Sequence, residues 1–269
     1  MNRTRRKAAV GRTASVKSAK PLFVSSRDSR ESSGRGGSVG GGQEPFKSRG
    51  MKVIAVTQIL NDPAARMVLE CLTWRVRVMT SVHFNRIVDA RFNENRTSLL
   101  PRLVAARLVH SATAAVTYHE AFAPMYSWSP GLPKPSFNAI AWRLAKRWQD
   151  ARSRRLTLYW ATEVAARLCA GTSRYSQHRS QVEHDLGVAS VLVRLHETDP
   201  EAADHWLGED ILRRGHELDR RLLAKIPDAA IVQDALAVKF VEFGGQYPAD
   251  RVRRFHDHCR LRNIPYELW

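Results

Sequence analysis

The chain has 269 residues, enough for two folded domains, and its apolar content of 43% is ordinary for a globular protein. Its net charge of +17 indicates a polyanionic partner, which is either nucleic acid or an anionic membrane surface. The three cysteines are widely separated, which argues against a disulfide framework and a zinc finger. The sequence has no apolar run of about 18 residues, which argues against a membrane span, and no apolar signal core, which argues against export. These features predict a cytoplasmic protein.

Residues 1–50 are predicted to be a disordered basic tail. They are rich in Ser, Gly, Arg and Lys and hold too few apolar residues to offset the entropy of ordering them. Two readings stay open for this segment. It is either a non-specific DNA-binding arm, or a spacer upstream of a start at Met51, where the ordered-looking part of the sequence opens.

Residues 51–170 are predicted to form a winged helix-turn-helix domain. Pro63 stands at the start of a first helix, Thr80 or Ser81 can cap a second, and Thr97 or Ser98 can cap a third. Two β-type segments follow, 114–119 and 125–128, and are expected to pair as the hairpin of the wing.

The third helix is expected to enter the major groove of double-stranded DNA, with the hairpin against the backbone beside it. The candidate DNA contacts are basic or polar residues around the helix-turn-helix: Arg96, Ser98, Arg102, Arg107 and His83. A winged helix can also serve protein contacts, so a protein-interaction scaffold is the alternative.

A further amphipathic helix is predicted over residues 138–150, followed by a strand at 156–160 and a helix at 162–168. Trp142 and Trp148 in the first of these could stack on single-stranded nucleic acid, but tryptophans at helical spacing are interpreted here as core anchors. The boundary between the two domains is placed at residues 171–175.

Residues 171–269 follow a helix, strand, strand, helix, strand order, which predicts a mixed sheet flanked by helices. Two apolar β-type runs in this part each carry one carboxylate, Asp228 and Glu242. A carboxylate on an otherwise apolar strand is costly unless it has a partner, so these two residues are candidates for a site.

Pro227-Asp228, followed by a strand that bears Glu242, resembles the PD-(D/E)xK nuclease superfamily. With a winged helix ahead of it, the chain resembles the plasmid replication-relaxation family, whose relatives include relaxases of mobilisable plasmids. The His184-Asp-Leu-Gly segment and Glu209 are similar to that family's pattern. The resemblance implies an α+β protein, an N-terminal winged helix-turn-helix followed by a restriction-endonuclease-like α/β domain with a mixed sheet.

The same resemblance implies that Asp228 and Glu242 bind Mg²⁺, which activates water or stabilises the leaving oxygen. It also implies a lysine two residues after Glu242 to stabilise the phosphate in the transition state, yet Gly244 stands there. Lys239 lies on the opposite face of the strand, so the replacements considered are Gln246 and Arg251.

The sequence therefore predicts a DNA-binding accessory factor in replication, mobilisation or regulation, with a nuclease-like domain that is catalytically weakened or inactive. The alternative is an active Mg²⁺-dependent DNA endonuclease or nickase that uses three carboxylates and one arginine: Asp228, Glu242, Glu209 and Arg251. Replication or relaxosome proteins are the expected protein partners. The sequence holds no Walker loop or dinucleotide fingerprint, so no nucleotide cofactor is expected, and Mg²⁺ is the only ion that the resemblance implies.

Overall fold

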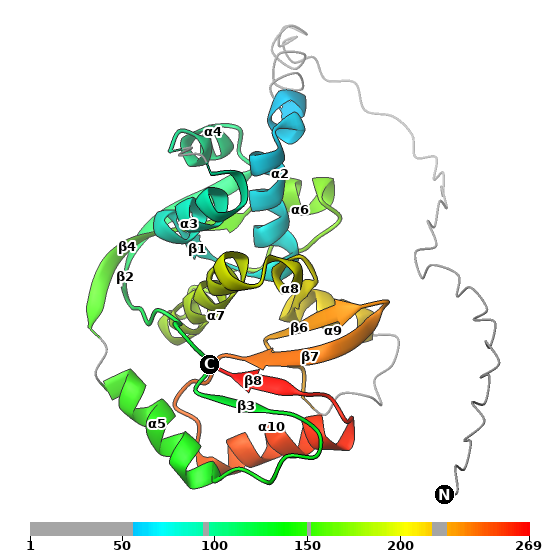
Figure 1. Ribbon diagram of the computed structural model, residues 1–269. Coiled ribbons are helices and arrows are strands. Elements are labelled where there is room, and N and C mark those ends of the chain that lie inside the picture. Colours follow the sequence, from blue (N-terminus) through cyan, green and yellow to red (C-terminus); the bar gives the residue numbers. More distant parts are fainter. Residues whose placement is uncertain (1–55, 94–96, 150–151, 217–224) are drawn as a thin grey trace, which may run out of the picture. The chain divides into compact units, whose positions relative to one another are not determined.

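A three-stranded antiparallel sheet and a five-stranded mixed sheet lie on two sides of a long central helix in the computed structural model of the chain (Figure 1). The structure describes residues 56–93, 97–149, 152–216 and 225–269. The predicted tail 1–50 and Arg96 lie outside these described residues. The α+β class predicted from the sequence is confirmed. Among the described residues, no helix is both long and apolar enough to cross a membrane.

The first half of the chain supplies mainly helices, and their ends follow the capping residues in the sequence. The helical elements are α2 (Pro63–Glu70), the π-helical turn η1 (Cys71–Arg75), α3 (Ser81–Phe92), α4 (Leu99–Ala105), α5 (Phe137–Gln149) and α6 (Glu163–Leu168). The Asp62 carboxylate caps α2, where Pro63 occupies the first turn, and the Thr80 hydroxyl caps α3. The N-terminal boundaries of both helices agree with the prediction.

The small sheet is built from β1 (Met79–Thr80), β2 (Val109–Thr117) and β4 (Ser153–Ala161), in the order β1-β4-β2. The predicted hairpin of 114–119 with 125–128 is wrong. β2 pairs along its whole length with β4, whereas residues 126–128 form β3 (Tyr126–Trp128) of the other sheet. A nine-residue antiparallel ladder forms far more backbone hydrogen bonds than a three-residue one, which explains why β2 pairs with β4.

The second half of the chain supplies the large sheet and the helices around it. Its elements are α7 (Arg179–Thr198), α8 (Pro200–Asp204), β5 (Trp206–Gly208), α9 (Glu209–His216), β6 (Ala229–Gln233), β7 (Leu236–Glu242), α10 (Ala249–Leu261) and β8 (Tyr266–Leu268). The strand order is β3-β8-β7-β6-β5. Only β7 and β8 are parallel, with α10 as the crossover between them, so the predicted mixed sheet is confirmed.

Helix α7 is the centre of the core. Twelve of its residues are buried, which gives it apolar character on nearly all sides, because it packs on α3 and the small sheet and also on one face of the large sheet. Near the end of β7, successive side chains face opposite sides of the large sheet: Val241 packs toward α7, and Phe240 packs toward α5 and α10 on the other face. Helices therefore cover both faces of the strands that carry the candidate carboxylates.

The boundary predicted at residues 171–175 does not separate the two sheets. The chain leaves the small sheet after β2, places β3 at the edge of the large sheet and α5 beneath it, and then returns as β4 (Figure 1). The core interpretation holds for part of α5 only, because Trp148 is half-buried while Trp142 is 64% exposed.

The contact between α7 and the end of β7 predicts a sharp response to one methyl group. A Cβ atom at Gly187 would lie 2.0 Å from the Phe243 ring, so Gly187→Ala is expected to lower the free energy of unfolding by about 1–3 kcal/mol. Gly215→Ala on α9 is the matched control, since its Cβ would meet nothing within 4 Å, and it should be neutral or stabilising by up to about 1 kcal/mol. Urea unfolding measures both changes, and equal midpoints for Gly187→Ala and the wild type would contradict the packing described.

Candidate functional site: carboxylates paired with internal cations

The two candidate carboxylates lie side by side at one end of the β6–β7 pair. Asp228 directly precedes β6 and Glu242 ends β7, and the register that pairs Ala229 with Val241 brings them together. Glu209 and Arg251 line the same pocket, which has a volume of about 540 Å³ and is called the carboxylate pocket here. All four predicted catalytic residues therefore surround one hollow.

Asp228 is held by two donors. Its Oδ2 atom accepts a hydrogen bond of 2.8 Å from the Phe243 backbone N–H and lies 3.1 Å from His184 Nε2 on α7. Burial disfavours the charged forms of both side chains, but their mutual attraction outweighs it. The carboxylate raises the pKa of His184 well above its usual 6.5, and the imidazolium lowers the pKa of Asp228. The pair is thus an ion pair.

Glu242 is almost fully buried, with 1% of its surface exposed. Its Oε1 atom accepts hydrogen bonds from Lys225 Nζ at 2.5 Å and from the Tyr247 hydroxyl at 3.0 Å, while Oε2 has no partner among the described residues. Burial and the neighbouring Asp228 raise the pKa of Glu242, and Lys225 opposes that rise. The Lys225 ammonium also sits over the Phe255 ring, 4.3 Å from its centroid.

Lys225 is the site residue that sequence reasoning missed. The search for a replacement lysine looked on the strand of Glu242 and beyond it, whereas Lys225 stands three residues before Asp228. The available signal was the Lys-Ile-Pro-Asp segment itself, because a residue so close to Asp228 must lie near the start of β6.

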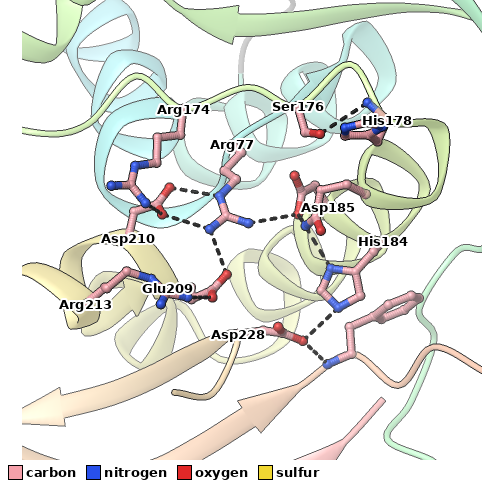
Figure 2. Close-up of polar contacts among 12 residues, drawn as sticks. Arg77, Arg174, Ser176, His178, His184, Asp185, Glu209, Asp210, Arg213 and Asp228 are labelled. Carbon is pink, nitrogen blue, oxygen red and sulfur yellow. Dashed lines mark hydrogen bonds and ion pairs between the residues drawn. The ribbon is translucent and has the colours of Figure 1, made fainter. Parts of the chain in front are cut away.

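The remaining acids of the site are gathered around Arg77, which precedes β1 (Figure 2). Its guanidinium forms a bidentate pair with Asp210, both contacts being 2.8 Å, and binds Glu209 Oε2 at 2.7 Å. A third acid, Asp185, lies 3.5 Å away. Burial disfavours the charged guanidinium, yet the three carboxylates raise the pKa of Arg77. Arg213 also binds Glu209, so this acid has two cationic partners.

Gly244, the position that lacks the motif lysine, has no room for a side chain. A Cβ atom there would lie 2.4 Å from a methyl group of Leu144 on α5. Its carbonyl accepts hydrogen bonds from Arg147 and from Trp148 Nε1, which ties this turn to α5. Arg251, one of the two residues considered as replacements for the motif lysine, stacks on the Tyr247 ring, with its guanidinium 3.7 Å from the ring centroid.

The donor set fits Mg²⁺ poorly. Within the described residues, no three His, Cys, Asp or Glu side chains are arranged to hold one metal ion. Asp228 is paired with His184, Glu242 with Lys225, and Glu209 with Arg77. Among the described residues, Glu242 Oε2 is the one fully buried carboxylate oxygen without a hydrogen-bond partner, and a hard cation needs several oxygen ligands.

The candidate DNA contacts divide into exposed and buried residues. Ser98, Arg102 and Arg107 are exposed, with Arg102 only 3.8 Å from Asp62 and Arg107 in a left-handed conformation just after α4. His83 is fully buried, and its Nε2 atom lies 2.7 Å from the Tyr118 hydroxyl. Burial lowers the pKa of His83 to about 3. Its expected role as a DNA contact is therefore corrected: His83 is a neutral core residue of the α3 cap.

The His184–Asp228 pair predicts a stability that depends on pH. Because folding raises the pKa of His184, the pair contributes fully below the unfolded pKa of about 6.5 and is lost as the pH rises through the folded-state pKa. His184→Gln should cost about 3 kcal/mol at about pH 6 and clearly less at about pH 9 or above. His205→Gln, an exposed histidine, is the control. Urea unfolding across this range measures the difference, and a cost independent of pH would rule out the ion pair.

The chain matches no known protein-family model, no curated protein and no solved structure. What the site does must be inferred from its own residues.

Proposed function

We propose that the chain is a double-stranded-DNA-binding protein of the replication-relaxation type, whose nuclease-like domain has lost or weakened catalysis. One observation carries the loss of catalysis: the carboxylates that would hold a metal ion are already paired with cations of the chain itself, namely His184, Lys225 and Arg77. On this proposal the domain uses its charges to hold its structure together and to recognise DNA.

The order of elements in the second half supports the nuclease-like assignment. Helices α7 and α8 are followed by β5, α9, the antiparallel strands β6 and β7, the crossover helix α10 and the parallel strand β8. Asp228 directly precedes β6 and Glu242 ends β7, so the two carboxylates lie next to each other, which supports the proposed relation to the superfamily.

The order of elements in the first half supports a winged helix-turn-helix. β1 is followed by α3, α4 and β2, and then, after β3 and α5, by β4, which pairs with β2 in a sheet of order β1-β4-β2. In this arrangement α4 is the groove-binding helix and the β2–β4 hairpin is the wing. Arg154 and Arg155 are exposed on that hairpin, and Arg102 is exposed on α4.

An active nuclease is the second candidate, and Lys225 is the observation that favours it. Its ammonium lies 2.5 Å from Glu242 Oε1 and supplies, from a different place in the sequence, the positive charge that Gly244 cannot. Replication or relaxosome proteins remain the proposed protein partners under either candidate.

The first test is cleavage. Supercoiled plasmid incubated with the purified chain and Mg²⁺ or Mn²⁺ is expected to remain intact, because the internal cations compete for the carboxylates that the ion needs. Gel electrophoresis gives the readout. Nicking by the wild type that disappears in both Asp228→Ala and Lys225→Met would overturn the proposal in favour of the second candidate. Nicking that persists in both variants would instead indicate a contaminating nuclease.

The second test is binding to DNA. Arg102→Ala is expected to weaken binding to a labelled duplex by about 1–3 kcal/mol if this arginine reads a base, or to lower the salt dependence by about one ion if it contacts a phosphate. Arg253→Ala on α10 is the control, since Arg253 is likewise exposed and weakly paired, 3.6 Å from Asp250. Fluorescence anisotropy measures both variants. A wild type that fails to bind duplex at low salt would support the protein-interaction scaffold instead.

A further inference from the structure

A second pocket, called the arginine pocket here, lies between α6 and α9 and has a volume of about 590 Å³. Four arginines line it, one from α6, one from the loop after it and two from α9: Arg167, Arg174, Arg213 and Arg214. Thr172 and Ser173 add hydroxyl groups to its wall. Neither the carboxylate chemistry nor the groove-binding helix accounts for this cluster.

The acids beside the arginine pocket do not neutralise it. Asp210 is already engaged by Arg77 through two contacts of 2.8 Å, so its contact with Arg174 at 3.5 Å is the weaker one (Figure 2). Glu163 lies 3.9 Å from Arg167, and both side chains are largely exposed, which makes that pair weak.

One of the four arginines is fixed in place by the backbone. The guanidinium of Arg214 donates hydrogen bonds to the carbonyl of Gly171 at 2.6 Å and to that of Ala170 at 3.4 Å. Neutral carbonyls hold the group without cancelling its charge. Arg213 is paired with Glu209, but that acid also binds Arg77. The pocket therefore presents one cation held by neutral carbonyls together with arginines whose acids are shared or exposed, which suits a ligand with several anionic oxygens.

The arginine pocket and the carboxylate pocket both adjoin a narrow hollow around Arg77. That hollow shares Arg174 and Asp210 with the arginine pocket. It shares His184, Glu209 and Asp228 with the carboxylate pocket. The two pockets therefore both border the Arg77 cluster.

We propose that the arginine pocket binds a phosphate group of a nucleic-acid backbone, next to the carboxylate pocket and separate from the groove-binding helix. This inference rests on the proposed function, because it takes DNA as the source of the phosphate. Arginine is suited to the role, since its planar fork matches two phosphate oxygens at once.

The test compares two double variants of the full chain in binding to a labelled duplex over a range of NaCl concentrations. Arg167→Ala/Arg214→Ala removes two pocket arginines that lie outside the Arg77 cluster. Arg253→Ala/Arg260→Ala removes two exposed arginines of α10 that are likewise weakly paired, at 3.6 and 3.7 Å from their acids. Both variants must first show the urea midpoint of the wild type, and if the Arg214 change fails that check, Arg214→Lys with Arg167→Ala replaces it.

The pocket variant is expected to bind about tenfold more weakly than the wild type, because a hydrogen bond between charged groups is lost. Its slope of log K against log salt should fall by about 0.9 for each phosphate contact removed, whereas the α10 variant should match the wild type. Equal affinity and slope for the pocket variant and the wild type would overturn the inference. If duplex binding by Arg102→Ala is weakened in the same experiment, the proposed function survives that failure.

Inorganic phosphate distinguishes the two sources of the ligand. The unfolding midpoint in phosphate is compared with that in chloride at equal ionic strength, for the wild type and the pocket variant. Weaker duplex binding by the pocket variant supports a backbone phosphate, whether or not free phosphate stabilises the wild type. Stabilisation by free phosphate that the variant loses, with duplex binding unchanged, would overturn the backbone source and identify a site for a small phosphate-bearing ligand.

Discussion

The guanidinium of Arg77 and the three carboxylates around it are the interaction on which the rest of the site depends. Asp185 comes from α7, and Glu209 and Asp210 open α9, so one side chain ahead of β1 joins two helices of the second half. Without this cation three acids would face one another in a partly buried hollow, at a cost of several kcal/mol. Helix α7, which carries His184, and helix α9, where the Glu209 backbone N–H donates to the Asp228 carbonyl, would then lose their common support.

The carboxylates of the site are neutralised by cations of the same chain. A metal-dependent enzyme would keep its carboxylates available for the ion. Here Asp228 is paired with His184, Glu242 with Lys225, and the acids of the cluster with Arg77. More than half of the net charge of +17 comes from residues 1–50, which hold twelve Lys and Arg against three acids. Among the described residues, exposed arginines lie in the α4 region, on β4 and around the arginine pocket. A surplus of positive charge of this size favours association with anionic partners.

Short sequence patterns predicted the positions of helices and strands well, but they did not predict which strands pair or which side chains form ion pairs. The caps at Asp62 and Thr80 and the two carboxylate strands follow from short-range rules, so they could be read from the sequence. β3 could not be paired correctly, because its partner β8 lies far along the chain. Arg77 was missed because its three acids lie 108 to 133 residues further along the chain. Lys225 lies close to Asp228 in the sequence and was missed because the motif places its lysine after Glu242. Periodicity also cannot tell which polar residue of a helix turns inward, as the burial of His83 shows.

The excursion from β2 through β3 and α5 to β4 has a consequence for how the protein must assemble. β3 is one edge strand of the large sheet, and α5 covers the face that carries Phe240. Both elements precede every other strand of that sheet in the chain. β3 cannot pair with β8, and α5 cannot pack on α10, until the C-terminal part of the chain has been synthesised. The first half therefore cannot fold completely by itself. The insertion between β2 and β4 thereby makes the two halves a single cooperative unit, in which the three-residue strands β3 and β5 are the two edges of the large sheet.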